Sequence, residues 1–241
     1  MAAAVTNLNG ETMLDFIGTM GICALMVLVV AALAVTLKAS DTGKLIFAAI
    51  AGLWIGFAAA STQAGWVAIG TPFPLIGLYV AAPLAAGALA AAIPAGRAGL
   101  LALPTRLLIG LNIGRVLAVL FFLLAREGRL SGPFPFYAGW GDIITGVLAI
   151  PILLVRLESK HPAVVMAWNV FGTVDLVNAI FLGTISQEGS LQIFGAPGSG
   201  AMQQLPWSFI PTVLVPYFLV AHGVIAAQLR SRRAQPIPST R

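Results

Sequence analysis

The sequence is poor in charged residues. Only 9% of its 241 residues are Asp, Glu, Lys or Arg, whereas 59% are hydrophobic and the mean hydropathy is +0.96. Soluble domains carry about 25% charged residues, so this composition excludes a soluble surface. We therefore expect an all-α integral membrane protein whose apolar segments run from end to end and leave no room for a soluble domain.

Residue types that carry catalytic or metal chemistry are also scarce. The single cysteine, Cys23, lies in the first apolar segment, where it can form no disulfide within the chain. There are two histidines, His161 and His222. The sequence contains no Gly-x-Ser-x-Gly elbow, no P-loop and no His/Cys/Asp cluster with metal-ligand spacing. We predict no metal site, assign no catalytic residue and leave the cofactor unknown, so an enzyme is the less favoured interpretation.

Long apolar runs divide the chain into segments of membrane-spanning length. A helix needs about 20 apolar residues to cross the hydrocarbon core, and none of the segments shows the period-two pattern of barrel strands. The predicted spans are 14–37, 45–61, 72–93, 105–125, 138–156, 163–185 and 206–229. They predict a seven-transmembrane-helix bundle that forms a single membrane domain over residues 1–241, with 230–241 as a basic cytoplasmic tail.

The basic residues predict the orientation. With the N-terminus outside, ten of the 13 Lys and Arg fall on the cytoplasmic side, two on the opposite side, and Arg115 within a span. This bias follows the positive-inside rule, so we interpret the net charge of +5 as a topology signal and not as a nucleic-acid surface. The first segment is too long for a signal peptide and has no basic residue before it. We expect a retained helix and a multi-pass protein of the inner (plasma) membrane.

Small residues and prolines leave alternatives open. The second span carries a stripe of small residues four positions apart: Ala48, Gly52, Gly56 and Ala60. We expect this stripe to pack within the bundle; a dimer interface is the alternative. Three prolines, at positions 83, 211 and 216, are interpreted as kinks, although such breaks can also expose carbonyls to a ligand. The long connection 186–205 is either a lid or only a loop.

Two charged side chains stand in the middle of predicted spans. A central arginine costs about 2.5–3.5 kcal/mol on insertion scales, so Arg115 must face the bundle interior or water, with Asn112 on the same face. Asp175 lies in the sixth span with Asn178 three residues on. At 1.5 Å per residue the depths of Arg115 and Asp175 differ by about 6 Å. An ion pair between them is feasible if their helices touch.

A second carboxylate lies in the fifth span. The stretches "GWGDIITGV" (139–147) and "GTVDLVNAI" (172–180) share the pattern Gly-x-x-Asp, which places Asp142 at the position of Asp175. The pattern indicates either a weak internal repeat or coincidence. His222, in the last span, is the remaining candidate; an interhelical hydrogen bond is the plain interpretation and a single-ligand haem or pigment the alternative.

Three functions are consistent with these residues. The first is a small-molecule or proton-linked transporter or binding protein that uses the buried Arg/Asp network as a ligand or ion pathway. The second is an accessory or scaffold subunit of a larger membrane complex, which would turn the small-residue stripe outward and bind pigment or lipid. The third is an enzyme acting on a lipid or isoprenoid. The expected partners are the lipid bilayer, a small-molecule ligand, and membrane proteins or a second copy of the chain, but not nucleic acid.

Overall fold

The computed structural model describes residues 12–67, 76–188 and 191–233, and every regular element longer than a turn in these ranges is a helix. Six helical segments are long and apolar enough to cross a membrane: Met13–Thr36, Asp41–Gln63, Thr105–Arg126, Phe134–Leu154, Pro162–Ile185 and Ile210–Arg232. A further pair of helices, bent by 107° at residue 93, counts as a seventh span if the pair is one crossing. The chain is therefore an all-helical, multi-pass membrane protein.

The helices follow one another in a simple order. In chain order they are α1 (Met13–Thr36), α2 (Asp41–Gln63), α3 (Ile76–Ala92), α4 (Pro94–Ala102), α5 (Thr105–Leu111), η1 (Asn112–Ala118), α6 (Val119–Arg126), α7 (Phe134–Leu154), α8 (Leu157–Lys160), α9 (Pro162–Ile185), η2 (Gly200–Gln203), η3 (Ile210–Leu214) and α10 (Val215–Arg233). The segments α5, η1 and α6 form one crossing, with a 3-10 helix at its centre. The π-helix η3 leads into α10, and π-helical turns occur often at functional sites.

Local signals explain where several helices begin. A capping box of Thr12 and Asp15 starts α1, and the hydroxyl of Ser40 caps α2. Pro94 starts α4 at the bend after α3, where a proline needs no amide partner. The stretch between the predicted spans 72–93 and 105–125 thus contains a helix of its own, because Pro94 restarts a helix in a new direction. Likewise, residues 206–208 form a turn and do not belong to the last span.

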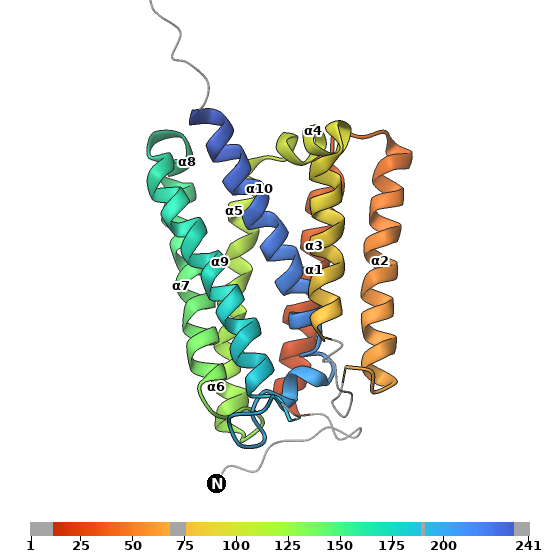
Figure 1. Ribbon diagram of the computed structural model, residues 1–241, viewed down its shortest axis with the longest axis vertical. Helices are drawn as coiled ribbons and strands as arrows, with labels where there is room; N and C mark the ends of the chain where they lie inside the picture. Colours follow the sequence, from red (N-terminus) through yellow and green to blue (C-terminus); the bar gives the residue numbers. More distant parts are fainter. Residues whose placement is uncertain (1–11, 68–75, 189–190, 234–241) are drawn as a thin grey trace, which may run out of the picture.

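The bundle has two distinct ends (Figure 1). The short helices α4 and α8 lie at one end, together with the C-terminal end of α10; we call this the α4/α8 end. The start of α1, the end of α6 and the segment around η2 lie at the other, which we call the loop end. Helices α7, α9, α10 and the α5–α6 crossing pack closely, whereas α2 stands at the periphery.

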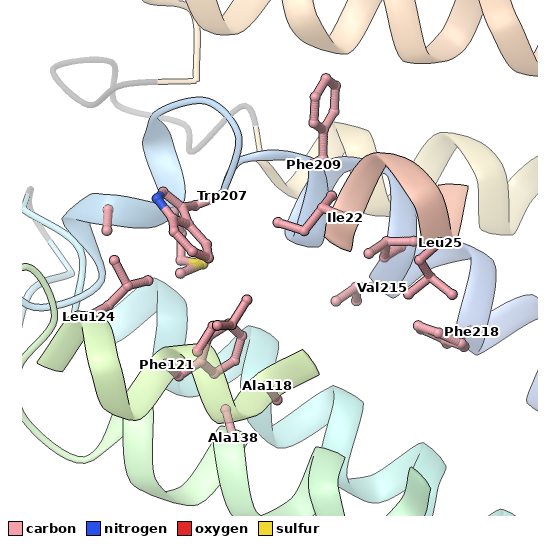
Figure 2. Close-up of a cluster of buried hydrophobic side chains, with 14 of the residues drawn as sticks. Ile22, Leu25, Ala118, Phe121, Leu124, Ala138, Trp207, Phe209, Val215 and Phe218 are labelled. Atoms are coloured by element: carbon pink, nitrogen blue, oxygen red, sulfur yellow. The ribbon is translucent and has the colours of Figure 1, made fainter. Parts of the chain in front are cut away.

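Apolar side chains fill the bundle in two clusters. The larger cluster joins α1, α6, α7 and α10, and Ile22 and Phe121 lie between Trp207 on one side and Phe218 on the other (Figure 2). Trp207 is fully buried and its ring occupies the space that Gly18 leaves on α1. The second cluster fills the α4/α8 end between α5, α7, α9 and α10. These clusters hold the polar centre of the bundle between them.

The small-residue stripe of α2 faces away from the bundle. Gly52 and Gly56 are exposed, and a Cβ added at either position would meet nothing within 4 Å. Only Ala58 and Ser61 of this helix are buried. The expectation that the stripe packs within the bundle was wrong, because α2 contacts α1 and η3 through the opposite face, where Trp54 donates a hydrogen bond to the Thr212 carbonyl.

Candidate functional site

Arg115 lies at the centre of the bundle, on the 3-10 helix η1 between α7 and α9. The close approach of η1 to α7 depends on Gly146, where a Cβ would come within 3.1 Å of the Asn112 carbonyl oxygen. The Arg115 side chain also faces α10, because its guanidinium lies 5.7 Å from the centre of the Phe218 ring. Only 1% of the Arg115 side chain is exposed, so protein groups must satisfy its donors.

Both candidate carboxylates bind this one guanidinium. Arg115 Nε donates to Asp142 Oδ1 on α7 at 2.6 Å, and Nη2 donates to Asp175 Oδ2 on α9 at 2.6 Å. The Arg115–Asp175 ion pair that the sequence made feasible is present. The Gly-x-x-Asp patterns of the two helices thus bring both acids to the same cation, and the short charge-assisted bonds fix its position.

Two glycines make room for the cluster. A Cβ at Gly141 would collide with the Asp175 carboxylate, so this glycine lets the side chain lie against the backbone of α7. A Cβ at Gly172 would stand 2.7 Å from the His222 ring. Small residues at these positions permit the close helix packing that membrane bundles require, and here they also admit polar side chains between the helices.

His222 joins the cluster in a defined tautomer. Its Nε2 lies 3.1 Å from Arg115 Nη1, and its Nδ1 lies 2.9 Å from Asn169 Oδ1. A guanidinium can only donate, so Nε2 accepts and the ring proton is on Nδ1, which donates to Asn169. The Asn169 amide in turn donates to the His222 carbonyl at 3.1 Å. His222 is therefore neutral in this arrangement and adds no positive charge.

Asn169 belongs to the cluster although it was not among the predicted site residues, and two predicted residues lie apart from the cluster. Asn169 is one helical turn before Thr173 on α9 and 2% exposed; its polar character in a spanning segment was the available signal. Asn112 is fully buried but donates back to the Leu108 carbonyl of its own helix. Asn178 is half-buried, and its side chain forms no hydrogen bond with the described part of the chain. His161 is exposed at the start of α9.

The cluster carries an excess of negative charge. It contains one guanidinium, two carboxylates and a neutral imidazole, all at least nine-tenths buried as residues. With both carboxylates ionised its net charge is −1, and an uncompensated charge in such a place is costly. The geometry therefore calls for one more positive charge at the carboxylates, supplied by a proton or by a small cation.

Two small cavities reach Asp142. One, of about 50 Å³, extends from Asp142 to the loop end, where Thr184, Gln187, Ser199 and Gln203 line it. The other, of about 40 Å³, lies beside Arg115 and Asp142 on the α1 side. A water needs a cavity of about 10–15 Å³, so both have room for water. The cavity of about 50 Å³ forms a path with polar side chains at the loop end, the Asp142 carboxylate at the other end and mostly apolar walls between them.

Gln187 gives this path an unsatisfied donor. Its side chain is 4% exposed, it lines the larger cavity, and its Nε2 has no hydrogen-bond partner among the described residues. Buried polar groups of this kind are rare. A water or ligand in the cavity would satisfy the donor. The connection 186–205 thus supplies part of the cavity wall, through Gln187, Ser199 and Gln203.

The opposite end is closed by packed side chains and a polar lock. Ile109, Val165 and Ile225 are each fully buried there, on the α4/α8 side of His222. Beyond them Arg106 donates to buried Glu158 at 2.8 Å. A second set of bonds joins Thr105, Gln228 and Arg232. We call these five polar side chains the α4/α8 lock.

The described residues contain no group of three His, Cys, Asp or Glu side chains placed to hold a metal ion.

A family model described as a domain of unknown function, DUF8737, matches residues 72–230, which include the whole Arg115 cluster and leave out α1 and α2. No curated protein and no solved structure matches the chain.

Proposed function

Because the chain belongs to the DUF8737 family, whose description states no role, we propose its function from the geometry of the Arg115 cluster. The protein is a proton-linked transporter of the inner membrane, in which the carboxylates of Asp142 and Asp175 bind and release one proton or small cation. It crosses the membrane seven times, α3 and α4 together making the third crossing, with the N-terminus outside.

One observation carries the proposal: a single buried guanidinium holds two carboxylates. A charge-balanced pair would serve as a fixed device that sets helix register. The second carboxylate leaves the site one positive charge short. Whether a proton or a cation occupies the site then depends on the concentration of protons or cations around it. Ionisable residues within membrane spans often mark ion pathways and proton relays.

Access to the site supports transport over a closed structural role. The larger cavity leads from Asp142 to the loop end, which this topology places outside. The α4/α8 end carries the basic residues Arg97, Arg156, Lys160 and Arg230, as the positive-inside rule expects of a cytoplasmic face. The site is thus accessible to water from one side and closed on the other, as alternating access requires of a carrier in one of its states.

The test is proton uptake by liposomes that contain the purified protein and a trapped pH-sensitive dye. A potassium diffusion potential, negative inside, should drive acidification of the lumen by the wild type. Asp175→Asn should abolish it, because the neutral amide removes the excess charge and with it the exchangeable proton. Repeating the assay with sodium or potassium gradients at constant pH distinguishes a cation from a proton.

The matched control is Asp15→Asn. Asp15 also pairs with an arginine, Arg129, at 2.8 Å, but it lines neither cavity. It should leave uptake unchanged. Wild-type protein that moves neither protons nor cations under any gradient, with a thermal unfolding profile showing that it is folded, contradicts the proposal; so does undiminished uptake by Asp175→Asn.

The outward stripe of α2 favours a second candidate, an accessory subunit that docks through this face. Close backbone packing across Gly52 and Gly56 is the usual way in which membrane helices associate. Gly52→Leu would block that approach without a clash inside the chain. If the protein purifies as an oligomer or with another chain, this variant should release the partner; an unchanged assembly contradicts docking through α2.

A further inference from the structure

A third cavity lies outside the Arg115 cluster, between α3, α4 and α10. Its volume is about 310 Å³, which reaches the range of about 300–1,000 Å³ typical of small-molecule sites. Its walls are apolar except at one point, where Arg97 of α4 lines it. The apolar lining includes Leu84, Gly87, Leu100, Leu219 and Gly223.

Two glycines give this groove its shape. At Gly87 on α3 a Cβ would come within 3.2 Å of Val220, so α3 and α10 touch at this level. At Gly223, one helical turn further along α10, a Cβ would meet nothing within 4 Å. The helices therefore diverge after their contact and leave an open apolar slot towards the α4/α8 end.

The charged side of the groove lies at the membrane surface. Because α4 is turned by 107° from α3, it runs across the end of the bundle (Figure 1). Arg97 is exposed on this helix, and no carboxylate of the described residues pairs with it. The helices α3, α4 and α10 contain no acidic residue, while α10 adds Arg230 and Arg232 at the same end. The groove thus joins an apolar slot to an unopposed positive charge.

We infer that this groove binds an anionic phospholipid. One acyl chain occupies the slot between α3 and α10, and the phosphate lies against Arg97. An apolar slot alone would accept any lipid chain or a helix of another protein. The unopposed arginine at headgroup level selects the negative headgroup, as basic pockets between membrane helices do. This site is independent of the proposed transport.

The experiment is lipid retention measured by native mass spectrometry. The full-length protein, purified in detergent, is supplied with phosphatidylglycerol or phosphatidylcholine of the same acyl chains. The wild type should retain about fivefold more phosphatidylglycerol, the preference expected from one basic residue near the surface. Arg97→Gln should retain both lipids equally. Gly223→Leu should retain neither, because its side chain fills the slot.

The matched control is Gly77→Leu, the same substitution on α3 where a Cβ also meets nothing within 4 Å. It should retain lipid as the wild type does, and thermal unfolding in detergent should show all variants folded. Equal retention of both lipids by the wild type would overturn the inference, as would full retention by Gly223→Leu. If Gly223→Leu does not fold, an unchanged preference in Arg97→Gln still overturns it.

Discussion

The two ends of the bundle differ in how far they separate the Arg115 cluster from the surface. At the loop end, one cavity of about 50 Å³ leads from polar side chains to Asp142. At the α4/α8 end, an apolar plug and then the α4/α8 lock separate the Arg115 cluster from the surface. The charges differ as well: the Arg106–Glu158 pair of the lock balances, whereas the Arg115 cluster does not.

Under the proposed function, this asymmetry predicts which end opens first. The Arg106–Glu158 ion pair can act as a latch, that is, a contact that breaks when this end opens, because water can hydrate its two charges when they separate. Already 47% of the Arg106 side chain is exposed. The charges of the Arg115 cluster are all buried and cannot be hydrated in this way. Only a proton or cation that arrives through the cavities can change the net charge of the cluster. Under the proposed function, loading at the loop end would precede release of the latch.

The largest effect is expected from Arg115→Gln. The substitution leaves two buried carboxylates without their cation, and breaking a buried pair by removing one partner costs about 3–5 kcal/mol. The free energy of unfolding should therefore fall by about this amount, measured by denaturant titration in detergent. Adding Asp175→Asn to Arg115→Gln should recover part of the loss, because one unpaired charge disappears. Equal stability of the single variant and the wild type would contradict the buried position of the cluster.

An intermediate effect is expected from Glu158→Gln at the α4/α8 end. Glu158 is buried but its partner is half-exposed, so the loss of stability should be about 1 kcal/mol, above that of a surface pair and below that of a buried one. The loosened lock should also expose the plug. A cysteine at Ala221, introduced with Cys23→Ala, should react faster with a maleimide when Glu158→Gln is present.

Glu127→Gln is the control for that measurement. Glu127 also faces an arginine, but at 3.6 Å and at the loop end. It should change neither stability nor the reactivity at position 221. Equal acceleration by both substitutions would mean that the two ends are not independently closed, and the comparison between them would fail.

The sequence predicts those parts of the molecule that depend on composition and on the free-energy cost of placing a charge in the membrane. Apolar runs specified the helices, and the cost of Arg115 in a membrane required a partner, which led to Asp175. The direction of the α2 stripe was not predictable, because a small-residue pattern does not say which neighbour it meets. The role of Asn169 and the bend at Pro94 depend on which helices adjoin, and a single sequence does not contain that information.

The smallest effect, and the sharpest test of the open end, is expected from Gly183→Ala. Gly183 lines the larger of the two cavities that reach Asp142. A Cβ added at Gly183 would meet the Phe134 ring at 3.4 Å, an ordinary contact. Replacing a helical glycine by alanine should stabilise the protein by about 0.5–1 kcal/mol, while the added methyl narrows the path to Asp142 and slows proton uptake. Gly99→Ala, at the α4/α8 end with nothing within 4 Å, should give the same stabilisation with unchanged uptake. Equal uptake by both variants would show that the proton does not take the cavity at the loop end, because only one of the two methyl groups stands in it.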